Sequence, residues 1–124
     1  MTAGQDTAVL VVQDGDSTSP DEVARWLREH LVGWAAVDVL LIDVVVGELF
    51  DNARRYGSPP YVLELVLDRW RESLVVSVRD RSARRSARWR SSAGLLLVDG
   101  LSERWGVLIQ SEFTTVWAEL LFTD

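Results

Sequence analysis

The sequence contains no cysteine and no lysine, and it has a single histidine, His30. Without cysteine the chain cannot form disulfides, use a thiol nucleophile or build a cysteine metal site. Without lysine it cannot contain a P-loop lysine or a Schiff-base lysine, and one histidine cannot build a histidine metal cluster. Arginine supplies all 13 basic residues.

Long apolar runs are also absent. The runs "VLLI" and "VVVG" are separated by Asp43 and are too short to span a bilayer. No N-terminal stretch combines basic residues, an apolar segment and a cleavage site, so we do not expect a signal peptide. The net charge of -6 argues against a broad nucleic-acid-binding surface. The simplest expectation is a cytoplasmic protein that does not bind membranes and for which nucleic-acid binding is not the default.

The first third of the chain predicts a strand and a helix. Residues 8–12, "AVLVV", are typical of a short buried strand. "SPDE" then predicts a helix start, because Ser19 can cap it, the next proline fits the first helical position and Glu22 completes a capping box. The apolar spacing ends near Gly33. His30 lies beside that apolar stripe, which favours a helix-end role over a catalytic one.

The stretch from Val37 to Val46 is rich in β-branched residues, and propensity alone would permit a strand. No turn signal appears before Gly57 and Pro59, however. We therefore predict one long, mostly buried helix from about Ala36 to Tyr56. Gly47 within it is expected where a neighbour approaches closely.

Four strands and one helix are predicted after this long helix. The strands are runs rich in β-branched and other apolar residues bounded by turn signals, the first two joined by a tight turn around Trp70 and Arg71. The helix, "AGLLLVDGLSERW", has Leu95, Val98 and Leu101 on one side. In chain order the ranges are strands 61–68 and 73–80, helix 93–105, and strands 106–110 and 114–122.

This order of elements predicts the fold class. One strand is followed by two helices, two strands, a loop, a helix and two strands. Helices grouped in this way against hairpins favour a two-layer α/β (α+β) sandwich, with a mixed, mostly antiparallel sheet and the helices on one face. The 124 residues, 48% hydrophobic and 26% charged, suit one globular domain spanning 1–124, without internal repeats.

The stretch "ELFDNARRYG", residues 48–57, is the first candidate site. In a helix Glu48 and Asn52 share one face, and Asp51 and Arg55 form a second pair typical of surface support. A Glu48 carboxylate can act as a general base, and the Asn52 oxygen suits a hard cation such as Mg²⁺, which keeps most of its other ligands as water and phosphate. On spacing alone, a buried helix that ends in solvent explains both residues more simply.

Two further places carry chemistry. Asp80, at a strand end, can accept a hydrogen bond from an exocyclic amine such as that of adenine, or can simply begin a turn. In "SSAGLLLV", Ser91 or Ser92 can cap a helix whose first amides form an anion site, where Gly94 lets a phosphate approach. A plain N-cap and a small packing residue explain that pattern equally well.

A stretch rich in arginine joins these two places. It can grip phosphates, an acidic partner or single-stranded nucleic acid, although a solvated arm accounts for most of it. Nucleic-acid contact would show a steep salt dependence, which the acidic remainder of the chain would oppose. Six arginines fall within twelve residues, together with Trp89: Arg79, Arg81, Arg84, Arg85, Arg88 and Arg90.

Taken in order, these motifs resemble those of the GHKL (histidine kinase-like) ATPase superfamily. The resemblance is to the small anti-sigma-factor-type serine kinases in particular, including the stand-alone ATP-binding regulators of actinobacteria. "ELFDNARRYG" resembles the N box, "VSVRD" the start of the first glycine box, "AGLLLVDGLSERWGV" the second box and its helix, and "TTVWAEL" the closing strand. The likeness covers roughly residues 19–122, and four motifs in order are more specific than any one.

The resemblance implies ATP and Mg²⁺ as ligands. Glu48 would be the catalytic base that orients a water or a substrate serine hydroxyl, and Asn52 would bind the Mg²⁺ that bridges the ATP phosphates. Asp80 would read the adenine amine, with Thr115 supporting it through water.

The resemblance also assigns positions around the phosphates. Gly94 and its neighbouring amides would face them, with Ser92 at the second-box position before it. The segment of about 79–93 would be the ATP lid.

This sequence departs from the family pattern in its glycines. The first glycine box, normally Asp-x-Gly-x-Gly, reads Asp80-Arg81-Ser82-Ala83-Arg84, and the first glycine of the second box is Ser92. Their backbone freedom is lost, although the arginines can replace some amide contacts to phosphate. Catalysis is therefore left open, and if the chain is an enzyme we expect an ATP-dependent protein serine/threonine kinase.

The leading hypothesis is an ATP-binding regulator that controls a sigma factor or a STAS-domain anti-anti-sigma protein. The alternative is a degenerate, non-catalytic GHKL-fold module that binds a protein partner without turnover. Homodimerisation is an expectation carried by the family alone.

Overall fold

The computed structural model describes residues 5–13, 20–82 and 93–122. Five strands and three helices are found in these ranges. They are β1 (Gln5–Val12), α1 (Pro20–His30), α2 (Ala36–Tyr56), β2 (Tyr61–Asp68), β3 (Ser73–Asp80), α3 (Ala93–Leu101), β4 (Arg104–Gln110) and β5 (Phe113–Leu121).

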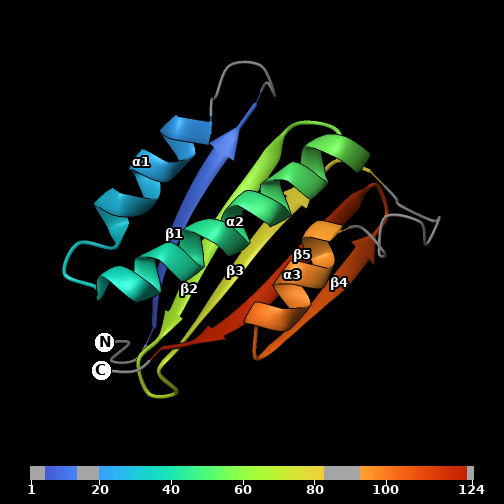
Figure 1. The fold of residues 1–124 in the computed structure, drawn as a ribbon. Coiled ribbons are helices and arrows are strands. Elements are labelled where there is room, and N and C mark those ends of the chain that lie inside the picture. Colours follow the sequence, from blue (N-terminus) through green and yellow to red (C-terminus); the bar gives the residue numbers. More distant parts are fainter. Residues whose placement is uncertain (1–4, 14–19, 83–92, 123–124) are drawn as a thin grey trace.

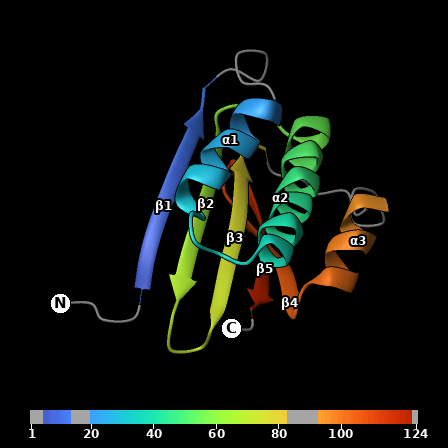
Figure 2. The same ribbon diagram turned by 60° about the vertical axis from the view of Figure 1, so that its left-hand side comes forward.

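The strands form one sheet in the order β1-β2-β3-β5-β4, and each neighbouring pair is antiparallel. The three helices lie on one face of this sheet, with α2 across its middle, α1 toward β1 and α3 toward β4 (Figure 1). Figure 2, turned by 60°, shows the helices and the sheet as two layers. The predicted two-layer sandwich with helices on one face is therefore confirmed.

The core lies between α2 and the central strands. The buried residues of α2 include Ile42, Val45, Val46, Leu49 and Ala53. Their helical spacing places them on the face that packs against the sheet, and this burial favours a helix although the stretch is rich in β-branched residues. Each fully buried valine or leucine contributes roughly 1.5–3 kcal/mol. On β2, β3 and β5 the residues that face the helices alternate along each strand, as period-two geometry requires. The buried residues of this alternation are Tyr61, Leu63, Leu65, Leu74, Val76, Val78, Asp80, Thr114, Val116, Ala118 and Leu120, and Ser73 and Glu119 are buried outside it.

The predictions of a helix over 36–56 and strands over 61–68 and 73–80 are confirmed at both ends. The helix predicted over 93–105 is too long. It ends at Leu101, where the Ser102 N–H donates to the Val98 carbonyl at 3.0 Å, and β4 already begins at Arg104. Leu101 is 38% exposed although Leu95 and Val98 are buried. At 100° per residue, its position has drifted off their side of the helix.

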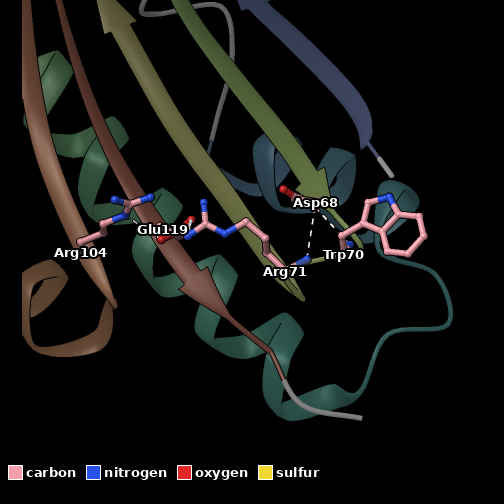
Figure 3. A network of polar contacts seen from close by, with 5 residues as sticks. All are labelled: Asp68, Trp70, Arg71, Arg104 and Glu119. Atoms are coloured by element: carbon pink, nitrogen blue, oxygen red, sulfur yellow. Dashed lines mark hydrogen bonds and ion pairs between the residues drawn. The ribbon is translucent and has the colours of Figure 1, made fainter. Parts of the chain in front are cut away.

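Polar contacts at one end of the sheet fix the turn between β2 and β3 and link it to β5 (Figure 3). The Asp68 carboxylate accepts hydrogen bonds from the backbone N–H groups of Trp70 and Arg71, at 3.1 and 3.3 Å, and so forms the predicted tight turn. Glu119 lies between two arginines, with Oε1 2.8 Å from Arg104 Nε and Oε2 3.6 Å from Arg71 Nη2. This buried carboxylate therefore links β5 to β4 and to the β2–β3 turn.

His30 ends α1, and its Nδ1 lies 2.9 Å from the Trp26 carbonyl, which agrees with the predicted helix-end role. Within the described ranges no helix is long and apolar enough to cross a membrane.

Candidate functional site

The last turns of α2 and the start of α3 enclose a cleft of about 430 Å³. The long helix contributes two carboxylates, one amide, one arginine and one tyrosine, and α3 contributes small and apolar residues. The cleft therefore brings together three residues that the sequence singled out: Glu48, Asn52 and Gly94. Its full lining is Glu48, Asp51, Asn52, Arg55, Tyr56, Ala93, Gly94 and Leu97.

Asn52 is the most unusual member of this lining. Its side chain is 5% exposed, and neither its amide oxygen nor its amide nitrogen has a hydrogen-bond partner within the described part of the chain. A buried polar group left in this state costs roughly 1–3 kcal/mol. An asparagine that merely ended the helix in solvent would be exposed. Its burial beside a cleft instead points to a ligand that satisfies it.

Glu48 lies one helical turn before Asn52 and is half buried. It lies against Gly94 at the start of α3, so closely that a Cβ at position 94 would overlap the Glu48 carboxylate oxygen Oε2. A side chain at position 94 would therefore have to displace the Glu48 carboxylate. The carboxylate consequently faces the first turn of α3, next to the backbone amides that open that helix.

The charges of the cleft are mixed. Glu48 and Asp51 contribute two carboxylates, and Arg55 contributes one guanidinium. A polyphosphate alone would be repelled by the carboxylates, whereas a divalent cation would offset them. No group of three or more metal-ligating side chains is found in the residues that the structure describes. A metal held by Asn52 would thus take most of its ligands from water and phosphate, as Mg²⁺ commonly does.

Asp80 does not line this cleft. It is fully buried, and its Oδ1 accepts a hydrogen bond of 2.6 Å from the Ser82 hydroxyl. Gly57, which follows α2, packs against it so tightly that a Cβ there would overlap the carboxylate. The structure therefore places Asp80 behind the end of α2 rather than beside Glu48 and Asn52.

Thr115 was expected to support Asp80, but it lies on the opposite face of the sheet from Asp80. The β3–β5 register pairs Asp80 with Thr114, whereas Thr115 pairs with Arg79. Because neighbouring strand residues point to opposite faces, Thr115 belongs to the face that carries no helix. Thr114 is fully buried, and its hydroxyl donates to the Ser82 carbonyl at 2.5 Å.

Sequence reasoning missed Thr114 and Gly57. Counting back in steps of two from the apolar residues Val116 and Ala118 would have identified Thr114 as core-facing. Gly57 was treated only as a stop signal. Its backbone is extended, with φ -126, so its small size rather than its conformational freedom matters here.

Two other expectations have different outcomes. Ser92 and the alternative cap Ser91 lie outside the described residues, as does most of the arginine-rich stretch. Gly47 was expected at a close approach, but a Cβ there would have nothing within 4 Å, so that expectation is wrong. Gly47 instead lines a second groove, of about 420 Å³, between α1 and α2.

Comparisons with known proteins give a fold likeness only. No protein-family model and no curated protein matches the sequence. The structure is similar to the crystal structure of the RsbU and RsbW domains of Rv1364c from Mycobacterium tuberculosis, with a TM-score of 0.71 and 20% identity. The match covers 94% of this chain and 32% of that one, so this chain spans about a third of the length of its neighbour. The likeness supports the same two-layer fold.

Proposed function

We propose that residues 1–124 form one histidine kinase-like ATPase domain of the anti-sigma regulator type, and that the α2–α3 cleft binds Mg²⁺ and the phosphates of ATP. The observation that carries this proposal is the buried, unpartnered Asn52 in a cleft that also contains Glu48. The order of motifs supports it, as does the fold shared with a structure that includes an RsbW domain.

In this proposal Asn52 contributes its amide oxygen to Mg²⁺, which offsets phosphate charge when bound. Arg55, which is exposed at the cleft, pairs with a phosphate oxygen. The first backbone amides of α3 lie beside Gly94 and contribute further donors. These groups bind and orient the triphosphate, which is most of what catalysis of phosphoryl transfer requires.

Glu48 is the proposed general base. It accepts the proton of an attacking serine hydroxyl as that oxygen bonds to the γ-phosphorus and the bond to the bridging oxygen of the departing diphosphate breaks. The serine belongs to a protein partner, which we propose to be a STAS-domain antagonist, with a sigma factor as the protein under control. The regulator would act in the cytoplasm, where this machinery operates.

A second candidate is a non-catalytic module of the same fold that binds its protein partner without turnover. The observation that favours it is the Ser82 hydroxyl on Asp80, at a position where the resembled family has a glycine. Both candidates predict partner binding, but only the first predicts that Glu48 is required for phosphoryl transfer.

The test is isothermal titration of the protein with ATP in the presence of Mg²⁺, and again with EDTA. We expect saturable binding that needs Mg²⁺ and weakens at least tenfold in Asn52→Ala. Gln110→Ala, which removes an exposed amide from β4, is the matched control and should bind as the wild type does. Equal affinities of the wild type and Asn52→Ala for Mg²⁺-ATP would contradict the assignment of Asn52.

A further inference from the structure

Hydrogen bonds hold the carboxylate that was expected to read adenine and the residues that follow it. Asp80 is 0% exposed. The Ser82 hydroxyl donates to its Oδ1 at 2.6 Å, and the Ser82 carbonyl in turn accepts the Thr114 hydroxyl at 2.5 Å. The residue after Asp80 is also fixed, because the Arg81 N–H donates to the Ser58 carbonyl at 2.8 Å. Three separate segments thus meet around Asp80.

In this network the Ser82 hydroxyl occupies Oδ1, and Gly57 lies against the carboxylate. Gly57 touches the Asp80 carboxylate so closely that even one methyl group would overlap it. A purine amine that approached Oδ1 would have to compete with the Ser82 hydroxyl for that oxygen. Asp80 therefore serves to join the end of α2, the end of β3 and the start of β5.

The cleft itself offers groups of a different kind. Asn52 and Arg55 suit a metal and phosphate oxygens, which every nucleoside triphosphate carries. Tyr56, 40% exposed, offers an aromatic surface, and stacking on such a surface tolerates any base because each has a π-face. Asp80, the acceptor that the resemblance assigns to the adenine amine, is not among the described residues that line this cleft.

Resting on the proposed function, we propose that the cleft binds Mg²⁺-bound nucleoside triphosphates through the phosphates and through stacking, without selecting adenine. In this proposal the lack of base selectivity comes from Ser82, whose hydroxyl occupies the Asp80 carboxylate. Ser82 is a specificity-determining residue that acts through Asp80.

The test compares ligands that share the triphosphate and differ in the base. The wild type is titrated with Mg²⁺-ATP, Mg²⁺-GTP and Mg²⁺-tripolyphosphate. We expect the dissociation constants of ATP and GTP to agree within about threefold, and tripolyphosphate to bind within about tenfold of them. A tenfold or greater preference for ATP over GTP would overturn this inference and leave the proposed function intact. Binding of none of the three would overturn both.

A variant tests the role of Ser82. Ser82→Gly removes the hydroxyl and its bulk, so that Oδ1 becomes available to the adenine amine, whereas guanine presents a carbonyl oxygen at that position and is repelled. We expect about a tenfold preference for ATP over GTP to appear. Ser58→Gly adds the same backbone freedom in the adjoining loop without altering the Ser82 hydroxyl that donates to Asp80. This variant should bind ATP and GTP with similar affinity, as the wild type does.

Two results would overturn the role of Ser82. One is equal affinity of Ser82→Gly for ATP and GTP, and the other is an equal preference for ATP over GTP in both glycine variants. Thermal melts of both variants show that each is folded during the titration. The comparison of ATP with GTP on the wild type is independent of either variant.

Discussion

Gly94 at the start of α3 and Glu48 on α2 are in such close contact that a Cβ at position 94 would overlap Glu48 Oε2. The obstructing atom is Oε2, the far end of a flexible side chain, so an alanine at position 94 can be accommodated if the carboxylate moves. The contact therefore controls the position of the carboxylate more than it controls folding.

We expect Gly94→Ala to leave the free energy of unfolding within about 1 kcal/mol of the wild type, because the gain in helix propensity offsets the local crowding. The displaced Glu48 should fill part of the cleft and weaken Mg²⁺-ATP binding about tenfold, as measured by calorimetry. Gly100→Ala is the matched control on the same helix, because a Cβ there has nothing within 4 Å. Unchanged affinity in Gly94→Ala would contradict this account.

Asn52→Leu separates a binding role from a structural role. Leucine has nearly the shape of asparagine, and it removes two buried polar atoms that lack hydrogen-bond partners in the described chain. Without ligand, we expect the variant to be more stable by about 1–2 kcal/mol, which urea unfolding can measure. The same variant should lose Mg²⁺-dependent nucleotide binding. A loss of stability would instead mean that Asn52 has a structural partner, and our interpretation of its burial would be wrong.

Glu48→Gln tests the proposed base while preserving the shape of the side chain. We expect nucleotide affinity to change by less than about threefold, and the rate of γ-phosphate transfer to fall by roughly 10²–10⁴-fold. Labelled ATP measures that rate, with water or partner protein as acceptor. Asp51→Asn neutralises the other carboxylate of the cleft and should keep the activity. If no activity is found in the wild type either, the non-catalytic module is the better description.

The sequence predicted the fold well because the signals for it are local. The long helix was identified from the lack of a turn signal before Gly57, and the structure confirms it from Ala36 to Tyr56. The end of α3 was missed because Arg104 belongs to a strand through its pairing with Glu119, a contact between distant parts of the chain. Propensity within the window could not reveal that pairing.

The candidate site was predicted in part for the same reason. Glu48 and Asn52 are one turn apart on a helix, so their common face follows from spacing. That they meet Gly94 depends on how α3 packs against α2, which the family resemblance alone suggested. Thr115 was assigned to the wrong face of the sheet because neighbouring residues of a strand point to opposite faces, so a shift of one position along β5 changes the face. The roles of Glu48 and Asn52 in binding and catalysis stay predictions.

Among these glycine-to-alanine variants, Gly57→Ala should lower the free energy of unfolding the most. The extended backbone at Gly57 accepts alanine, so any effect comes from the overlap with the fully buried Asp80 carboxylate. Asp80 is held by the Ser82 hydroxyl, so it cannot move away without losing that bond. In urea unfolding we expect the free energy of unfolding to fall by about 2–4 kcal/mol, from the combined overpacking and disturbed hydrogen bonding.

Gly47→Ala, at an exposed position in α2 with open space around it, should instead stabilise the protein by about 0.5–1 kcal/mol. Equal stability of the two variants would show that the chain around Asp80 yields easily, and a base edge could then enter there.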